Sequence, residues 1–276
     1  MKSPFLLALA LVGVSAVLGG AAAAAQGMIA PLFAAHRGGA LLWPENSLLA
    51  FRNALALGAD FLELDVHLTR DGEVVVIHDA TLGRTTTGTG PVHGRTLAEL
   101  DTVRLKDRSG SLTEERIPTL EQVVALAVEG KRQILLEIKT GEGRQRYPDI
   151  EEKVFAVLDR HQFTPSTVVM AFEGATWRRV RQLRPDARVA ALYSARMLPA
   201  AGVAAELEAL RQAGVAFVGL DQAIVTAEVA KQARLAGLTL GVWTVNEREA
   251  IARFIDQGVG VVITDRPDLA KELLGR

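Results

Sequence analysis

The stretch Phe61-Leu62-Glu63-Leu64-Asp65-Val66-His67-Leu68 alternates polar and apolar side chains at every second position. Because alternate side chains of a strand share a face, this pattern predicts a strand with Glu63 and Asp65 on one face and the aliphatic residues on the other. Similar short runs rich in valine, isoleucine and leucine recur along the chain, at residues 32–36, 133–139, 167–172, 188–193, 216–220, 238–244 and 260–264. Longer amphipathic stretches separate them, as is typical of parallel strands joined by helices.

Eight such strand-and-helix units predict an α/β fold, a (β/α)8 TIM barrel, which needs about 250 residues. The expected helices are residues 47–57, 119–129, 150–161, 173–183, 206–213, 226–236 and 248–257. Their ends carry the expected signals: N-caps at Asn46-Ser47 and Thr119, and glycines just past the last turn at positions 58, 130, 214, 237 and 258. The alternative, a doubly wound open sheet, lacks its glycine-rich phosphate loop.

One segment interrupts the alternation of strands and helices. Residues 80–118, between the second and third strands, form a connection too long for a simple loop and carry many turn residues. Loops at the carboxyl ends of barrel strands build the active sites of such proteins. We therefore expect a small insertion here that covers one side of the barrel mouth.

The first residues have the pattern of a secretory signal peptide. Met1-Lys2 precedes an apolar run that ends in five consecutive alanines at 21–25. Cleavage after residue 25 leaves residues 26–276 as a single catalytic domain with no stable membrane span, exported to the periplasm or secreted. An uncleaved anchor is the alternative, because about 20 apolar residues span a bilayer. The chain has no cysteine, so disulfides are excluded.

The charge balance indicates the kind of partner. The formal net charge is −1 at pH 7, whereas proteins that bind nucleic acid generally present a basic surface. We therefore expect a small phosphate-containing substrate and no nucleic acid. The sequence gives no indication of an oligomeric state.

Three carboxylates are expected to meet inside the barrel. Glu137 lies on the strand predicted beside Glu63 and Asp65, on the same face as Lys139. Buried carboxylates repel one another unless a cation compensates them, and ligands that are all oxygen suit one hard divalent cation, Ca²⁺ or Mg²⁺. The alternative is an ion network in which Lys139 and Arg37 pair with the carboxylates and no metal binds.

Two histidines end predicted strands, where barrel enzymes keep their reactive groups. His36 ends the strand at 32–36 and is followed by Arg37, and His78 ends the extended residues 74–78. Cleavage of a phosphodiester needs an acid for the leaving alkoxide, a base for the nucleophile and cations for the phosphoryl oxygens. Histidine titrates near neutrality, so one ring can be protonated and act as the acid while the other is neutral and acts as the base. Together with the carboxylates, these residues predict a metal-dependent phosphodiesterase.

Several ordered motifs resemble the glycerophosphodiester phosphodiesterase family over nearly the whole chain after residue 25. They are His36-Arg37-Gly38, Pro44-Glu45-Asn46-Ser47, Glu63-Leu64-Asp65-Val66, Thr69-Arg70-Asp71-Gly72, His78-Asp79, Arg84-Thr85-Thr86, Leu136-Glu137-Ile138-Lys139, Val242-Trp243-Thr244-Val245-Asn246 and Ile263-Thr264-Asp265-Arg266-Pro267.

The resemblance implies a bacterial, exported enzyme that hydrolyses glycerophosphodiesters to glycerol 3-phosphate and an alcohol. Its catalytic acid and base would be His36 and His78. Its metal ligands would be Glu63, Asp65 and Glu137, and its substrate and phosphate contacts Arg37, Lys139, Glu45 and Trp243. These residues do not distinguish water from the substrate's own hydroxyl as the nucleophile.

Four further residues are expected to lie outside the catalytic set. His67 shares the face of Glu63 and is expected to support the site from behind. Asp265 follows the last strand and is expected to cap the turn before Pro267, with a place in the site as the alternative. His93 and His161 are expected at the surface. The fourth strand ends in Met170-Ala171-Phe172, where relatives of the family have a serine before the aromatic residue, so a polar contact at the mouth is expected to be missing.

Three other functions fit parts of the sequence. Lys139 could form a Schiff base, as in barrel aldolases, although neighbouring carboxylates would keep it protonated. A non-catalytic phosphate-binding protein would not need both histidines. A related barrel phosphodiesterase of phospholipase C or D type would need an apolar rim, for which Leu41, Leu42 and Trp43 are candidates.

Overall fold

A computed structural model describes residues 31–197 and 202–276. The expected signal segment, residues 1–25, lies outside them. Among the described residues, no helix combines the length and the apolar character that crossing a membrane requires.

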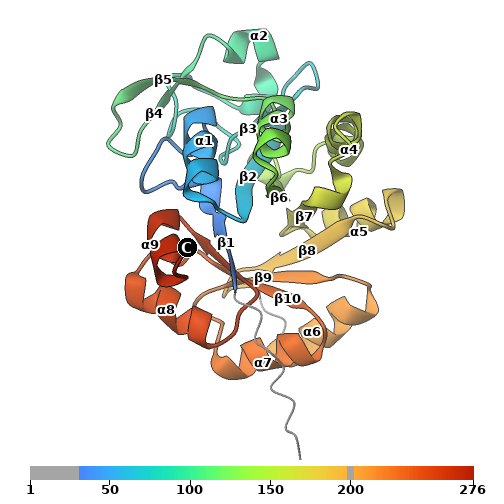
Figure 1. The fold of residues 1–276 in the computed structure, drawn as a ribbon. Coiled ribbons are helices and arrows are strands. Elements are labelled where there is room, and N and C mark those ends of the chain that lie inside the picture. The colour runs from blue at the N-terminus through green and yellow to red at the C-terminus, as the bar shows by residue number, and fades with distance from the viewer. Residues whose placement is uncertain (1–30, 198–201) are drawn as a thin grey trace, which may run out of the picture.

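Eight parallel strands form a closed barrel, which confirms the predicted fold (Figure 1). Neighbouring strands follow the chain order, and β1 pairs with both β2 and β11, so that the first and last strands close the sheet. The strands of the barrel are β1 (Leu32–Ala35), β2 (Phe61–Leu68), β6 (Gln133–Ile138), β7 (Thr167–Ala171), β8 (Arg188–Tyr193), β9 (Phe217–Asp221), β10 (Thr239–Trp243) and β11 (Val261–Thr264). Each coincides with a predicted strand to within two residues.

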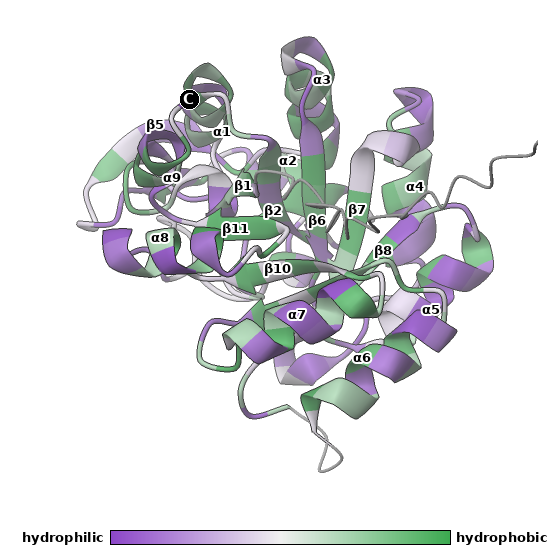
Figure 2. Cartoon of the chain, turned by 60° about the horizontal axis from the view of Figure 1, so that its bottom comes forward, coloured by the Kyte–Doolittle hydropathy of each residue, from purple (hydrophilic) through white to green (hydrophobic). Residues whose placement is uncertain are grey.

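Helices surround the barrel, as the amphipathic stretches predict. They are α1 (Leu48–Leu57), α3 (Leu120–Gly130), α4 (Ile150–Arg160), α5 (Gly174–Leu183), α6 (Val203–Gln212), α7 (Ala227–Leu235), α8 (Arg248–Asp256) and α9 (Pro267–Leu273). Short 3-10 turns are η1 (His36–Gly38), η3 (Glu142–Arg144) and η4 (Thr164–Ser166). Figure 2 shows largely apolar barrel strands, such as β10 and β11, and helices such as α6 and α7 that carry both polar and apolar residues.

Most helix boundaries follow the predicted signals, with two corrections. The Ser47 hydroxyl accepts a hydrogen bond from the Ala50 backbone, and Thr119 forms a capping box with Gln122. Asn46, however, does not cap α1, because its side chain donates to Asp65 instead. The glycine at position 130 is the last residue of α3, and the left-handed position after the helix is taken by the next residue, a lysine with φ 51°.

The strand alternation divides the core into two layers. Leu62, Leu64 and Val66 belong to the large cluster between the barrel and its helices. Phe61 belongs to the cluster inside the barrel, and Glu63 and Asp65 share its face. The charged face of β2 therefore points into the barrel, as predicted.

The segment between β3 (Val74–Val76) and α3 forms a unit with its own small core, at the top of Figure 1. It contains η2 (Val92–Gly94), α2 (Leu97–Leu100) and the hairpin of β4 (Arg104–Lys106) and β5 (Leu112–Arg116). Its core consists of Val75, Ile77, Leu82, Val92, Leu100, Leu105 and Ile117. The strand β3 pairs antiparallel with the end of β2, so this unit stands at the carboxyl end of the barrel.

Candidate active site

Most of the predicted site residues meet at one cavity of about 120 Å³ at the carboxyl ends of the strands. The cavity is lined by His36, Arg37, Glu63, His78, Glu137, Lys139, Met170, Phe172, Leu192, Trp243, Thr244 and Ile263. Two predicted site residues are absent from this lining. Asp65 lies behind it against Lys139, and Glu45 contacts the site through Arg37.

Glu63, Asp65 and Glu137 form a compact acidic cluster. One carboxylate oxygen from each lies within 4.8 Å of the other two, and the three residues are 2%, 1% and 7% exposed. The register of β2 and β6 explains this contact, because Asp65 stands directly beside Glu137. Burial and the charge of Asp65 raise the pKa of Glu63 to about 8.

Lys139 lies between two of these carboxylates. Its Nζ is 2.8 Å from Glu137 Oε1 and 3.4 Å from Asp65 Oδ1. Burial alone would lower the pKa of Lys139, but the two carboxylates outweigh it and raise the pKa above its ordinary value. A lysine that stays protonated is a poor nucleophile, which argues against a Schiff-base role.

A tight turn after β1 brings Arg37 to the cavity. Arg37, Gly38 and Gly39 all have positive φ, at 51°, 81° and 107°. At Gly38 the turn approaches α1 so closely that a Cβ would lie 2.7 Å from the Cβ of Ala50. The Arg37 backbone N–H donates to Glu63 Oε2 at 2.8 Å, while its Nε has no hydrogen-bond partner among the described residues.

Asp265 holds His36, which corrects the expectation that this aspartate caps a turn. Asp265 Oδ1 lies 2.6 Å from His36 Nδ1, and Asn246 Nδ2 donates to Asp265 Oδ2 at 2.7 Å. A carboxylate can only accept, so the His36 Nδ1 carries the proton and Nε2 faces the cavity side, 4.0 Å from Glu63. Burial lowers the pKa of His36, but Glu63 and Asp265 outweigh it and raise that pKa.

Asp79 holds His78 in the same way. Its Oδ1 lies 2.7 Å from His78 Nδ1, so the Nε2 of the neutral ring is free to exchange a proton. The hydrogen bond with His78 and the contact with Arg84 lower the pKa of Asp79. Both aspartates, Asp79 and Asp265, belong to the sequence motifs described above, but their pairing with the two histidines was not predicted.

His67 supports the backbone of His78, in agreement with its expected place behind the site. Its Nε2 lies 3.0 Å from the His78 carbonyl oxygen and its Nδ1 lies 2.7 Å from the Tyr147 hydroxyl. Since the carbonyl only accepts, Nε2 carries the proton and Tyr147 donates to Nδ1. Burial lowers the pKa of His67 to about 4, which keeps the ring neutral.

The other two histidines lie away from the cavity. His93 is exposed, as expected. His161 is only partly exposed and pairs with Glu121 through its Nε2.

One wall of the cavity is apolar. It consists of Met170, Phe172, Leu192, Trp243 and Ile263. The rings of Phe172 and Trp243 meet edge to face, with centroids 5.4 Å apart. The Nε1 of Trp243 is buried and has no hydrogen-bond partner among the described residues.

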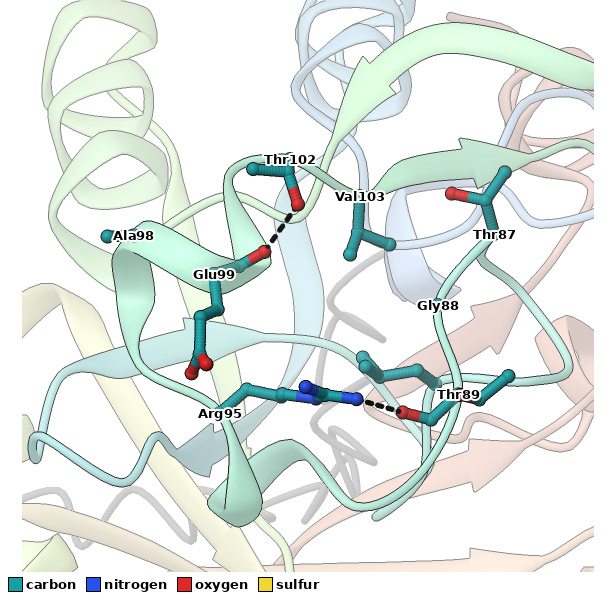
Figure 3. Close-up of a pocket in the computed structure, with 9 residues that line it drawn as sticks. Thr87, Gly88, Thr89, Arg95, Ala98, Glu99, Thr102 and Val103 are labelled. Carbon is teal, nitrogen blue, oxygen red and sulfur yellow. Dashed lines mark hydrogen bonds between the residues drawn. The ribbon is translucent and has the colours of Figure 1, made fainter.

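Three wider cavities lie elsewhere among the described residues, and none of the three is lined by a histidine. The cavity of Figure 3, about 580 Å³, is lined by the segment between β3 and β5. Its charged residues are engaged with their neighbours: Glu99 caps α2, and Arg95 points at the Thr89 carbonyl. The second, about 290 Å³, is lined by Leu41, Leu42 and Trp43 and by the hairpin turn at 107–109. The third, about 210 Å³, lies between the start of α1 and the end of β5.

A barrel whose carboxyl end holds two carboxylate-bound histidines, two cations and an acidic cluster has the constellation that barrel enzymes use for phosphoryl chemistry. The family model of the "Glycerophosphoryl diester phosphodiesterase family" matches residues 36–269. The chain belongs to this family.

Individual relatives agree. A glycerophosphodiester phosphodiesterase of Caldanaerobacter subterraneus subsp. tengcongensis is 35% identical over 238 residues, which are 86% of this chain and 95% of the relative. A structure from Agrobacterium tumefaciens is 30% identical with a TM-score of 0.82, covering 89% of this chain and 97% of that one. An Oleispira antarctica phosphodiesterase in complex with the product sn-glycerol-3-phosphate is 26% identical, with a TM-score of 0.76 and coverage of 89% and 97%.

Proposed function

We propose that this protein hydrolyses glycerophosphodiesters to glycerol 3-phosphate and an alcohol. One observation carries the proposal: two histidines, each held at Nδ1 by a carboxylate, line the same small cavity as Arg37 and Lys139. The two imidazoles can exchange protons at Nε2, one with the leaving alkoxide and one with the nucleophile. The likeness to a structure that holds sn-glycerol-3-phosphate supports the same substrate class.

We assign one divalent cation, Ca²⁺ or Mg²⁺, to Glu63, Asp65 and Glu137. Their chemistry fits such an ion, because they offer only carboxylate oxygens, within 4.8 Å of one another. Only two cations, Arg37 and Lys139, lie against these three carboxylates, and the pKa of Glu63 is raised, so a bound divalent cation would allow all three to stay ionised together. A bound cation supplies Lewis-acid stabilisation of the phosphoryl oxygens.

The chain's own residues bind and orient the substrate. Arg37 and Lys139, which both line the cavity, contact the phosphoryl oxygens. Glu45 does not contact the phosphate but orients Arg37, whose Nη1 lies 3.2 Å from Glu45 Oε1. The glycerol carbons pack against Trp243 and Phe172 on the apolar wall.

The pattern of residues 1–25 supports export to the periplasm or out of the cell, after cleavage of a signal segment. Residues 26–276 then act as one catalytic domain. The net charge of −1 fits a small-molecule substrate better than a nucleic acid.

The test is release of glycerol 3-phosphate from glycerophosphocholine and glycerophosphoethanolamine, with Ca²⁺, with Mg²⁺ and with EDTA. We expect release that depends on the metal. His36→Ala and His78→Ala should each remove most turnover while the circular dichroism spectrum and metal binding stay unchanged. Full activity in either variant would remove that histidine from the mechanism. No release with either metal, together with cleavage of phospholipids, would instead favour a phospholipase.

A further inference from the structure

A chain of charged side chains connects two residues that line the cavity, His78 and Arg37. Arg84, on the segment after β3, contacts two carboxylates at once. Its Nε and Nη2 donate to Asp79 at 2.6 and 3.0 Å, and its Nη1 and Nη2 donate to Glu45 at 2.8 Å each. Asp79 in turn accepts from His78, and Glu45 accepts from Arg37.

Only the ends of this chain reach the cavity. His78 and Arg37 line it, whereas Asp79, Arg84 and Glu45 do not. Arg84 therefore does not contact a phosphate group held inside the cavity. The contacts that connect Arg84 to this group run through the two carboxylates that it holds.

The geometry requires an arginine. The planar guanidinium presents donors along two edges, and here one edge faces each carboxylate. A lysine would carry the same charge but only one nitrogen, which cannot make four directed contacts. The clamp also joins two parts of the chain far apart in sequence, because Glu45 precedes α1 and Asp79 follows β3.

Fixing Asp79 has a direct consequence for His78. The carboxylate of Asp79 is only partly buried, with 26% of its side chain exposed, so without Arg84 it is free to rotate and to be solvated. The Nδ1 of His78 would then lose a fixed acceptor, and both the ring orientation and the preference for the Nδ1–H tautomer would weaken.

We propose that Arg84 is a positioning residue, which clamps Asp79 to Glu45 and thereby aims the Nε2 of His78 into the cavity. The inference rests on the proposed roles of His78 and Arg37. It assigns to the segment after β3 a part in catalysis that requires no contact with the substrate.

The kinetic test compares Arg84→Ala and Arg84→Lys with a matched control. Arg211 on α6 is similarly exposed, at 51% against 48% for Arg84, and it also binds one carboxylate, Glu208, through two nitrogens. We expect Arg84→Ala to lower kcat by about 10- to 100-fold, as loss of an outer partner of a site residue does, with a smaller change in KM. Arg84→Lys should recover little of this loss, and Arg211→Ala should keep kcat within about twofold of the original protein.

Chemical rescue separates positioning from folding. Because about half of the Arg84 side chain is exposed, free guanidinium can enter the space that Arg84→Ala leaves. Guanidinium at a concentration below that which unfolds the protein should raise kcat of Arg84→Ala, whereas NaCl of equal ionic strength should not. A kcat of Arg84→Ala equal to that of Arg211→Ala would overturn the proposal.

A second readout does not depend on activity. The ¹⁵N shifts of the neutral His78 ring, assigned by comparison with His78→Gln, report which nitrogen carries the proton. We expect the Nδ1–H tautomer in the original protein and a mixture in Arg84→Ala, and an unchanged tautomer would contradict the clamp. If the original protein failed to release glycerol 3-phosphate, the proposed function would fall, while the ring shifts would still decide on Arg84.

Discussion

The pairing of His36 with Asp265 predicts a large effect from Asp265→Asn. Asn246 determines how the new side-chain amide at position 265 is oriented. The Oδ1 of Asn246 accepts from the Asp265 backbone at 2.9 Å and from Thr264 Oγ1 at 3.3 Å, so its Nδ2 must face the residue at 265. The new amide would turn its oxygen toward that Nδ2 and its nitrogen toward His36.

The substitution would therefore place a donor where His36 needs an acceptor. The imidazole would carry its proton on Nε2, and that nitrogen could no longer accept one. Loss of a hydrogen bond to a charged group costs about 1.5–3 kcal/mol, or roughly 13- to 160-fold in rate. The reversed tautomer should lower the rate further, because a ring protonated at Nε2 cannot act as the base. In serine proteases, replacing the aspartate that holds the catalytic histidine by asparagine lowers kcat about 10⁴-fold. We expect kcat to fall by about 10²- to 10⁴-fold.

The assay is release of glycerol 3-phosphate, with a second variant as its control. Adding Asn246→Asp to Asp265→Asn supplies a carboxylate that accepts from the amide nitrogen at 265. The amide oxygen is then free to accept from His36 Nδ1, so the double variant should regain much of the lost kcat. If the double variant were no more active than Asp265→Asn, the tautomer argument would be refuted.

Three further predictions concern the metal, the turn after β1 and a buried histidine. Glu63→Gln should weaken binding of the divalent cation by about 10- to 100-fold in isothermal titration, and an unchanged affinity would remove Glu63 from the ligands. Gly38→Ala should lower the free energy of unfolding by about 2–4 kcal/mol in urea, because it combines positive φ with overpacking. Gly90 has a φ of +80° and open space around it, so Gly90→Ala should lower the free energy of unfolding by only about 1–2 kcal/mol. An equal decrease in Gly38→Ala and Gly90→Ala would contradict the packing argument. Since the folded protein lowers the pKa of His67 from 6.5 to about 4, the unfolded chain alone binds this proton between those values. His67 should therefore make the protein about 2 kcal/mol less stable at about pH 5 than at about pH 7.5, and His67→Gln should remove this part of the pH dependence.

The barrel could be predicted from the sequence because its signals are local. Alternation places Glu63 and Asp65 on one face whatever the rest of the chain does, and the aliphatic runs mark each buried strand. The boundary near residue 130 was misplaced because a lysine, rather than the glycine before it, takes the left-handed position after α3. A glycine near a helix end indicates the end only to within a residue or two.

The partners of the two histidines could not be predicted in the same way. His36 and Asp265 are separated by 229 positions, and they meet only because β1 pairs with β11. Arg84 reaches Glu45 across 39 positions, from a segment whose fold has no periodic pattern. Asp79 is adjacent to His78 in sequence, but the sequence alone does not tell whether the Asp79 carboxylate faces the His78 ring. That depends on the backbone conformation at the two residues.

Closure of the sheet between β1 and β11 also sets when the site comes into being. The strand that leads to His36, β1, is the first of the barrel to be synthesised, and the strand that leads to Asp265, β11, is the last. While β11 is still inside the ribosome, the nascent chain already contains His36, but Asp265 is not yet available to pair with it. The rate at which enzymatic activity returns during refolding should therefore report the pairing of β1 with β11. Circular dichroism, which measures total secondary structure, does not report this pairing.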